Sequence, residues 1–222
     1  MEFVNTGDGS KTLYHAEVGE HYHSKHGAYQ ESIHVFLKTG LQYWLEKENK
    51  QAAAILEIGF GTGLNFLLSA DWAMKNKVGL DYVGIEAYPL EKDLLIQSGY
   101  DGYVANEIWT AFTQEYETAQ QGKTPITEHI LLKIAVQKVM DFQTDQKFDV
   151  IYFDAFAEIH QPEMWTAETL AHVVQFLNPG GVFVTYAITG NLKRAMKALG
   201  FSIEKAPGAP GKREMLRATK LF

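Results

Sequence analysis

The chain has 222 residues, of which 46% are hydrophobic, and its formal net charge is −7. This length suffices for one domain with a sizeable core, and the acidic balance argues against a general nucleic-acid binder. The absence of cysteine excludes disulfides, thiolate catalysis and zinc sites built on sulfur. No segment resembles a signal peptide and no apolar run reaches the ~18 residues that span a bilayer, so we expect a cytoplasmic protein.

Strand and helix patterns alternate along most of the chain. Residues 1–34 are polar and rich in glycine and histidine, with one weak strand pattern over Lys11–Val18. The predicted helices are Ile33–Lys47, Leu64–Asn76, Pro89–Ser98, Asn106–Ala119, Ala167–Phe176 and Asn191–Leu199. The predicted strands are Ala53–Ile58, Asp81–Glu86, Ile130–Val136, Phe148–Asp154, Val182–Ala187, Phe201–Lys205 and Glu214–Lys220. This alternation predicts an α/β fold with a mostly parallel sheet, covered on both faces, that ends in an antiparallel hairpin.

A glycine-rich loop follows the first of these buried strands. The segment Ile55–Phe66, ILEIGFGTGLNF, brings Glu57 and then three glycines at alternate positions, Gly59, Gly61 and Gly63. Dinucleotide sites favour G-x-G-x-x-G, in which a helix start holds a pyrophosphate. The tighter G-x-G-x-G spacing suits a nucleoside ligand without phosphate, of which S-adenosylmethionine is the commonest, although a purely structural turn would use the same glycines.

Acidic residues end two further strands. Glu86 closes the run DYVGIE, where a carboxylate can accept both hydroxyls of a ribose, or can be a solvated strand-end acid. Asp154 ends FDVIYFD. Because ligands of open α/β sheets bind beyond the carboxyl ends of the strands, we expect both acids on the same rim as the glycine loop. With the terminal hairpin, this arrangement predicts a Rossmann-like class I S-adenosylmethionine-dependent methyltransferase.

The charge is unevenly distributed. Residues 190–222 contain eight Lys and Arg against two Glu, whereas the preceding residues contain twelve against twenty-five Asp and Glu. The tail is therefore a candidate surface for phosphates, or else a solvated basic face. Its candidate residues are Lys193, Arg194, Lys197, Lys212, Arg213 and Arg217.

Several motifs together resemble one known family. The segments are YHSKHGAYQESIHVFL, GFGTGLNF, DAFAEIHQPEMW, the NPGG turn and GKREML, in this order. They resemble the tRNA 5-aminomethyl(-2-thio)uridine methyltransferase family, which is MnmD-like when free-standing and forms the amino-terminal half of bifunctional MnmC. The resemblance covers nearly the whole chain.

This resemblance implies a reaction and a set of site residues. Members transfer a methyl group from S-adenosylmethionine to the exocyclic amine of 5-aminomethyl(-2-thio)uridine at the tRNA wobble position. We expect Asp154 to orient the amine and take its proton. The expected cofactor-binding residues are Glu57, Gly59, Gly61, Gly63, Asn65, Glu86, Gln137 and Asp154. The expected substrate-binding residues are Glu31, Phe156, Trp165, Tyr186, Lys212 and Arg213, with a core role equally open for Trp165.

Domain organisation follows from the same resemblance. We expect residues 1–34 to form an extension or lid, in which Tyr22, Ser24 and Glu31 cover the site, and residues 35–222 to form the methyltransferase domain. Since the sequence ends at Phe222, we expect no flavin domain and a separate oxidase that supplies the amine. The oligomeric state is not predicted.

The sequence departs from the family pattern at two places. Glu158 stands where the motif after the catalytic strand usually ends in proline, which predicts a less rigid loop. Members often carry an acidic residue that accepts a hydrogen bond from the adenine amino group. This chain has Gln137 or Lys138 at that place, so Gln137 or the nearby Asp141 is the candidate acceptor.

Three alternatives stay open from the sequence. The same fold can methylate a small-molecule amine, which the acidic body of the chain would attract. It can also bind S-adenosylmethionine without catalysis, with Asp154 only structural. Finally, the histidines His21, His23 and His26 invite a metal site, but no neighbouring carboxylate or thiolate completes a ligand set, so we expect none.

Overall fold

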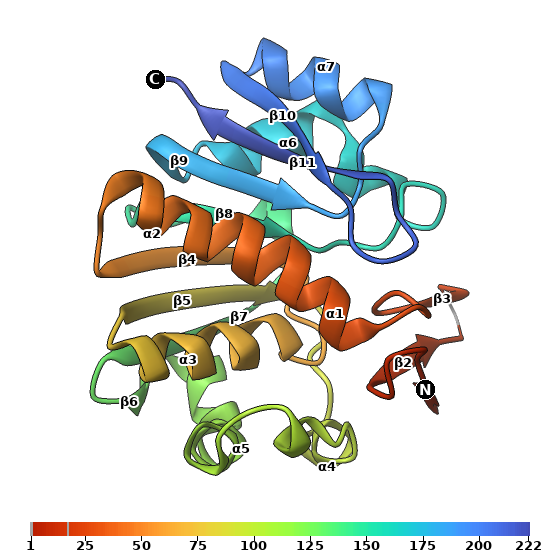
Figure 1. Cartoon of the computed structure of the whole chain (residues 1–222), viewed down its shortest axis with the longest axis vertical. Helices are drawn as coiled ribbons and strands as arrows, with labels where there is room; N and C mark the ends of the chain where they lie inside the picture. The colour runs from red at the N-terminus through yellow and green to blue at the C-terminus, as the bar shows by residue number, and fades with distance from the viewer. Residues whose placement is uncertain (1, 17) are drawn as a thin grey trace.

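The computed structural model describes residues 2–16 and 18–222 (Figure 1). Among these residues, eight strands form the main sheet in the order β10-β11-β9-β8-β4-β5-β7-β6. The strands are β4 (Ala52–Ile58), β5 (Gly79–Glu86), β6 (Thr124–Thr127), β7 (Ile130–Val136), β8 (Phe148–Phe153), β9 (Leu177–Thr185), β10 (Phe201–Pro207) and β11 (Glu214–Lys220). The central pairings are parallel, whereas β6 pairs antiparallel with β7, and β11 pairs antiparallel with both β9 and β10. The predicted fold class is confirmed.

Helices cover both faces of this sheet (Figure 1). They are α1 (Ala28–Ser32), α2 (Tyr43–Glu48), α3 (Leu64–Asn76), α4 (Lys92–Ile96), α5 (Asn106–Gln121), α6 (Ala167–Val174) and α7 (Gly190–Ala198), with short 3₁₀ turns at Tyr100–Gly102, Val139–Asp141 and Pro162–Trp165. One hydrophobic core lies between the sheet and the helices α1 to α3 and α5, and a second lies between the sheet and α6 and α7. Burial of both faces explains why the central strands are apolar at nearly every position.

A single helical segment joins the amino-terminal residues to the main domain. It consists of α1, a π-helical stretch over Ile33–Gln42, and α2. Gly40 lies where this stretch crosses the sheet, and a Cβ there would come within 2.9 Å of Tyr152 and 3.0 Å of Val184. The helix therefore packs closely because this position has no side chain. The domain boundary predicted after residue 34 falls inside this segment.

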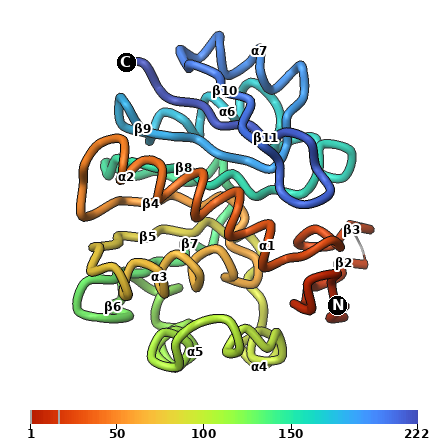
Figure 2. The backbone as a smooth tube through the Cα atoms, viewed as in Figure 1, coloured from red at the N-terminus to blue at the C-terminus, as the bar shows by residue number. Residues whose placement is uncertain are grey.

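The first residues form a small sheet of their own. Strands β1 (Glu2–Asn5), β2 (Lys11–His15) and β3 (Glu20–His21) pair antiparallel in that order. The strand predicted over Lys11–Val18 thus ends at His15, and its residue 17 lies outside the described residues. Figure 2 shows this small sheet at one end of the main sheet, near the loop between β10 and β11. Within the described residues, the helices are too short or too polar to cross a membrane.

Several elements of the main domain differ from the prediction. The helix predicted over Pro89–Ser98 is only one turn, Lys92–Ile96. Strand β9 begins at Leu177, before the NPGG turn, because its pairing with β8 shifts register there. Strand β6 was not predicted, since it is short and contains Pro125, which is compatible with an edge strand that needs fewer backbone donors.

Candidate active site

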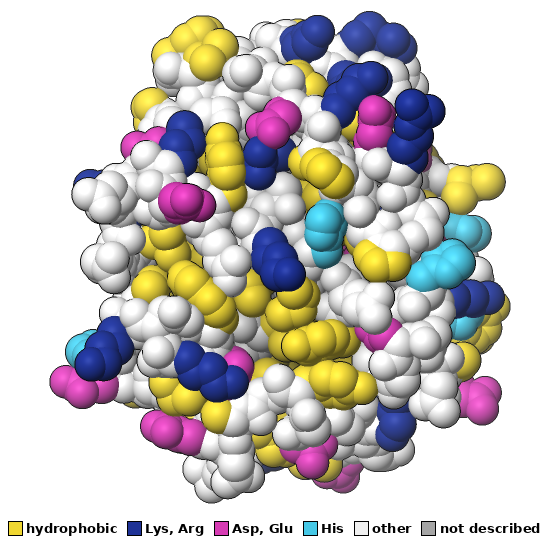
Figure 3. Space-filling view, in the orientation of Figure 1, with side chains coloured by type: hydrophobic (Ala, Val, Ile, Leu, Met, Phe, Trp, Pro, Cys, Tyr) yellow, Lys and Arg dark blue, Asp and Glu magenta, His cyan; other side chains and the backbone are white. Residues whose placement is uncertain are grey.

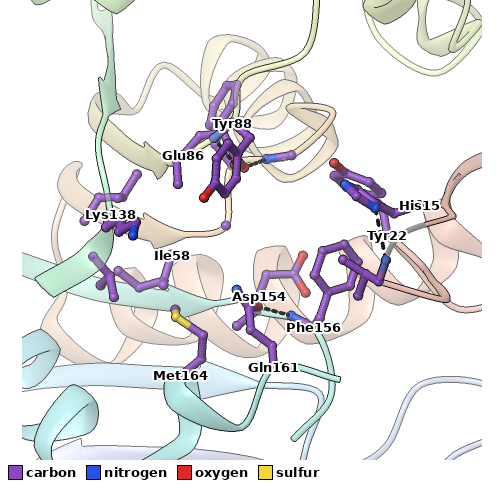
Figure 4. A pocket seen from close by; sticks show the side chains of 18 of the residues that line it. His15, Tyr22, Ile58, Glu86, Tyr88, Lys138, Asp154, Phe156, Gln161 and Met164 are labelled. Atoms are coloured by element: carbon purple, nitrogen blue, oxygen red, sulfur yellow. Dashed lines mark hydrogen bonds between the residues drawn. The ribbon is translucent and has the colours of Figure 1, made fainter. Parts of the chain in front are cut away.

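A cavity of about 760 Å³ lies beyond the carboxyl ends of β4, β5, β7 and β8 (Figure 4). The glycine loop, Glu86 to Tyr88, Gln137 to Asp141, and Asp154 to Phe156 supply most of its wall. The small amino-terminal sheet and its loops add His15, Val18, Tyr22 and His23. The segments that the sequence predicts on one rim of the sheet therefore line a common cavity.

The glycine loop approaches the end of β8 very closely. Gly59 has φ +84°, and a Cβ there would lie 2.5 Å from the backbone oxygen of Asp154. Gly61 has φ +52°, and a Cβ there would lie 2.8 Å from the ring of Tyr22. Both positions therefore need glycine, since the backbone is left-handed and the neighbours fill the space. Gly63 also has a positive φ, but it faces Phe112 and lies outside the cavity lining.

Glu86 holds the glycine loop from the neighbouring strand. Its carboxylate accepts hydrogen bonds from the backbone nitrogens of Gly61 at 2.9 Å and of Tyr88 at 3.0 Å. Figure 4 shows Glu86 and Tyr88 across the cavity from Asp154 and Met164. Each carboxylate oxygen keeps a free lone pair, so Glu86 can also accept from a ligand hydroxyl. Tyr88, whose side chain is 72% exposed, was not predicted as a site residue.

Residues after β7 form the next part of the wall. Gln137, Lys138, Met140 and Asp141 line the cavity, and Gln137 is anchored through its backbone nitrogen to the backbone oxygen of Glu86 at 3.1 Å. Both residues considered for the adenine contact, Gln137 and Asp141, thus lie in the same wall as Glu86.

Asp154 belongs to a buried chain of polar groups. The side-chain nitrogen of Asn65 donates to Asp154 Oδ2 and to Glu57 Oε1, each at 2.8 Å. The Tyr82 hydroxyl donates to Glu57 Oε2 at 2.8 Å. Asn65 Oδ1 is buried and has no hydrogen-bond partner among the described residues. One amide nitrogen therefore bridges two carboxyl groups.

The surroundings of Asp154 and Glu57 raise the pKa of both carboxyl groups. Burial raises the pKa of Asp154 to about 8, with a further increase from the charge of Glu31 and an opposing decrease from the Asn65 hydrogen bond. Burial also raises the pKa of Glu57 well above its usual range, and the charge of Asp154 adds to this effect. Glu57 is completely buried and lies outside the lining of the cavity.

A smaller cavity of about 260 Å³ adjoins the first one at Asp154, Ala155 and Phe156. Its other walls come from β3, the loop after it, helix α1 and the segments that follow β9 and precede β11, which supply Glu31, Tyr186 and Lys212. The Phe156 ring packs edge-on against Tyr22, with 5.2 Å between ring centroids. Asp154 thus lies at the junction of two cavities, one on the side of the glycine loop and one beneath the amino-terminal segment.

Two expected substrate residues lie outside both cavity linings. Trp165 is buried, packs edge-on against Phe153 at 5.0 Å, and donates through Nε1 to the backbone oxygen of Phe156 at 2.8 Å. This favours the core role for Trp165. Arg213 is exposed on the β10–β11 loop.

Glu20 is a site residue that the sequence did not indicate. Its carboxylate accepts from the backbone nitrogen of Ala157 at 2.9 Å, which ties the small sheet to the loop after β8. In the same loop, the backbone nitrogen of Phe156 donates to the Gln161 side chain at 3.2 Å. These contacts hold the loop that contains Glu158. Glu20 belongs to no motif, and Gln161 lies inside the DAFAEIHQPEMW motif without being singled out, so only the folded chain reveals their contacts.

The histidines and the basic residues of the tail differ in where they lie. His15, His21 and His23 line the cavities, whereas the basic candidates other than Lys212 lie outside both linings. Among the described residues, no three His, Asp or Glu side chains are placed to share a metal ion. His23 is half-buried, and the loss of solvent around its ring lowers its pKa to about 4. Figure 3 shows Lys and Arg side chains gathered at the end of the molecule that carries α7, β10 and β11. Of the basic candidates, Lys212 lines a cavity, whereas Arg217 pairs with Glu204.

Known proteins resemble this chain over most of its length. It is 30% identical over 207 residues to the tRNA 5-methylaminomethyl-2-thiouridine biosynthesis bifunctional protein MnmC of Magnetococcus marinus, covering 89% of this chain and 30% of that protein. The MnmC protein of Aromatoleum aromaticum is 29% identical over 222 residues, covering 96% of this chain and 34% of that protein. The chain therefore spans about a third of the length of the curated relatives that it matches.

Solved structures support the fold. The crystal structure of MnmC2 from Aquifex aeolicus superposes with a TM-score of 0.77 at 23% identity, covering 98% of this chain and 70% of that one. A magnesium protoporphyrin IX methyltransferase from Synechocystis with bound S-adenosylmethionine superposes with a TM-score of 0.50 at 13% identity, covering 81% of this chain and 76% of that one.

A family model supplies the decisive similarity. Residues 103–221, just over half of the chain, match the model described as S-adenosyl-L-methionine-dependent methyltransferase. The resemblance that the motifs indicate is thereby confirmed. By its sequence and its fold, the chain belongs to the family of S-adenosyl-L-methionine-dependent methyltransferases.

Proposed function

We propose that this chain transfers a methyl group from S-adenosylmethionine to the primary amine of 5-aminomethyl(-2-thio)uridine at the wobble position of tRNA. The observation that carries the proposal is the position of Asp154, which lines both the larger cavity and the smaller one. A base at such a junction meets the methyl donor on one side and the acceptor on the other. The names of the MnmC relatives support tRNA as the substrate.

The larger cavity suits S-adenosylmethionine in three respects. The bare backbone at Gly59 and Gly61 lets a ligand lie against the loop. Glu86 offers free lone pairs for ribose hydroxyls. Gln137 or Asp141 would accept from the adenine amino group. The bound cofactor supplies an electrophilic methyl group on a sulfonium.

Glu57 and Gly63 would act indirectly on the cofactor. Glu57 fixes Asn65 from behind through the 2.8 Å hydrogen bond. Gly63 begins helix α3 and lets the loop turn against Phe112. We expect both residues to position the cofactor-binding groups without contacting the cofactor.

The raised pKa of Asp154 matters for an amine acceptor. An alkylammonium of pKa ~10.4 must lose its proton before its lone pair can attack a methyl group, in line with the leaving sulfur. Transfer of that proton to an ordinary Asp would cost roughly 9 kcal/mol, at about 1.36 kcal/mol per pKa unit. With an Asp154 pKa of about 8, the cost falls to roughly 3 kcal/mol.

The remaining residues shape the acceptor side. Phe156 and Tyr186 line the smaller cavity, where a ring stacked on an extruded uracil stabilises it by roughly 1–3 kcal/mol. The segment over residues 1–34 acts as a lid, since Tyr22 lies against Gly61 and Phe156, and Glu20 holds the loop after β8. A separate oxidase would supply the amine. The exposed Arg213, with Lys193, Arg194 and Lys197, is available for tRNA phosphates.

The test is transfer of labelled methyl to tRNA that carries 5-aminomethyluridine, compared with tRNA that lacks this amine, followed by nucleoside digestion and mass analysis. Label only in 5-methylaminomethyluridine supports the proposal. The variant Asp154→Ala should bind S-adenosylmethionine as the wild type does and lose at least 10²-fold in turnover. Label in small amines but in neither tRNA would reject the tRNA substrate, and undiminished transfer by Asp154→Ala would reject the base.

A further inference from the structure

One lysine of this chain already places an alkylammonium group in the smaller cavity. Lys212 Nζ lies 2.7 Å from Glu31 Oε1 and 4.0 Å from the centroid of the Tyr186 ring, over its face. A carboxylate beside an aromatic face is a favourable environment for a primary ammonium group. The amine of the proposed substrate has the same chemical form.

The groups that surround this ammonium are fixed by the fold. Glu31 is 6% exposed and its Oε2 accepts from the backbone nitrogen of Ser24 at 2.8 Å. The Tyr186 hydroxyl donates to the backbone oxygen of Ala155 at 2.9 Å, and its ring packs edge-on against Trp165 at 6.2 Å. The corner formed by Glu31 and Tyr186 would therefore keep its shape without Lys212.

Lys212 itself is held only weakly. Its side chain is 34% exposed, and it extends from the β10–β11 loop, where Pro210, Gly211 and Arg213 are exposed. Because the lysine side of this pair stays in contact with solvent, Lys212 can leave the pair without a large change in its own hydration. In contrast, the buried Glu31 would be strongly destabilised without any counter-charge. An incoming ammonium can therefore replace Lys212 at a small cost, because Glu31 stays paired throughout the exchange.

We propose that the Glu31–Tyr186 corner is the binding position for the ammonium group of the amine substrate, and that Lys212 occupies this position until the substrate displaces it. The inference rests on the proposed function and deepens it. It makes Glu31 and Tyr186 specificity-determining residues for a cationic amine beside Asp154. It also assigns Lys212 a role other than contact with phosphate.

A titration with benzylammonium tests the exchange without tRNA. We would load the full chain with S-adenosylhomocysteine and follow binding by NMR, with benzyl alcohol as the neutral probe. Lys212→Met keeps the apolar stem and removes the charge, so it should tighten benzylammonium binding about fivefold. Glu31→Gln keeps an acceptor for Ser24 and should weaken binding at least tenfold. Neither variant should change binding of benzyl alcohol.

Lys205→Met is the matched control. Lys205 lies in the same hairpin and approaches Glu214 at 3.8 Å on the exposed surface, away from the cavity. This variant should bind benzylammonium as the wild type does. Unchanged or weaker binding by Lys212→Met, with a fold intact by circular dichroism, would overturn the inference, and this variant is decisive even where Glu31→Gln fails to fold.

Methyl transfer to tRNA tests the proposed function independently of the benzylammonium titration. In that assay Lys212→Met should lower the KM for aminomethyluridine tRNA by a similar factor. If the wild type methylates this tRNA while Lys212→Met raises KM, the inference fails and the proposed function stands. If benzylammonium behaves as expected and no tRNA is methylated, the corner binds amines and the tRNA substrate is wrong.

Discussion

The hydrogen bond from Asn65 to Asp154 should set the pH at which the enzyme becomes active. The bond joins Asn65 Nδ2 to Asp154 Oδ2 at 2.8 Å and lowers the Asp154 pKa, against the larger effect of burial that raises it to about 8. Asn65→Leu removes this donor at similar volume. A hydrogen bond to a charged group contributes roughly 1.5–3 kcal/mol, so the Asp154 pKa should rise by about 1–2 units.

The direction of the change in activity follows from the protonation states. The amine must be neutral when it attacks, so Asp154 must be ionised in order to take the proton of a bound alkylammonium. Below pH 8, wild-type kcat/KM should therefore fall about tenfold per pH unit. In Asn65→Leu the acidic limb should move to about pH 9–10, so that at pH 7 kcat/KM falls roughly 10–100-fold.

The assay is labelled methyl transfer to aminomethyluridine tRNA from pH 6 to pH 10, at saturating S-adenosylmethionine, with cofactor affinity measured separately for each variant. Asn76→Leu is the matched control, because Asn76 lies on the same helix and its side chain bonds only to the exposed backbone oxygen of Trp72. A structural effect would lower kcat/KM equally at every pH. An acidic limb that stays at its wild-type pH in Asn65→Leu would refute the reasoning.

Two further predictions concern Asp154 itself and Glu86. Asp154→Asn should abolish turnover and stabilise the fold more at pH 8 than at pH 4. The pKa of Asp154 in the folded state is raised from 3.8 to about 8, so the wild type loses up to roughly 6 kcal/mol of stability as the pH rises through this range, whereas Asn does not titrate. Thermal unfolding of the wild type and Asp154→Asn at pH 4 and pH 8 measures this effect. The same difference in stability between the two proteins at both pH values would contradict the prediction. Glu86→Gln leaves the backbone nitrogen of Gly61 or of Tyr88 facing an NH₂ group, so S-adenosylmethionine affinity should fall roughly 10–100-fold at unchanged kcat. Equilibrium dialysis measures this affinity, and wild-type affinity in Glu86→Gln would contradict the prediction.

The sequence predicts those parts of the site that depend on short segments. A buried strand followed by alternate glycines, and strands that end in Glu86 and Asp154, are local patterns, and parallel strands bring their carboxyl ends to one edge. Fold class and rim could therefore be derived before any coordinates. The same rule placed Glu57 and Gly63 at the cofactor, because spacing does not distinguish a residue that faces a ligand from one that lies behind it.

Contacts between distant segments could not be predicted in this way. Lys212 and Glu31 are separated by 181 positions, and Ala157 and Glu20 by 137. Their pairing depends on how the amino-terminal segment crosses the end of the sheet, which no period or motif encodes. The π-helical stretch over Ile33–Gln42 was predicted as an ordinary helix because both forms give an apolar face.

The glycine loop has a second role that follows from helix geometry. Asn65 is the second residue of α3, and side chains in a helix point back toward its amino end. The tight turn at Gly59, Gly61 and Gly63 starts α3 close to the end of β4. The Asn65 amide therefore reaches both Glu57, on β4, and Asp154, which directly follows the adjacent strand β8. A longer loop would begin the helix farther from the sheet and separate Asn65 from both carboxyl groups. The spacing that we expect to hold a nucleoside therefore also positions the amide that lowers the pKa of Asp154.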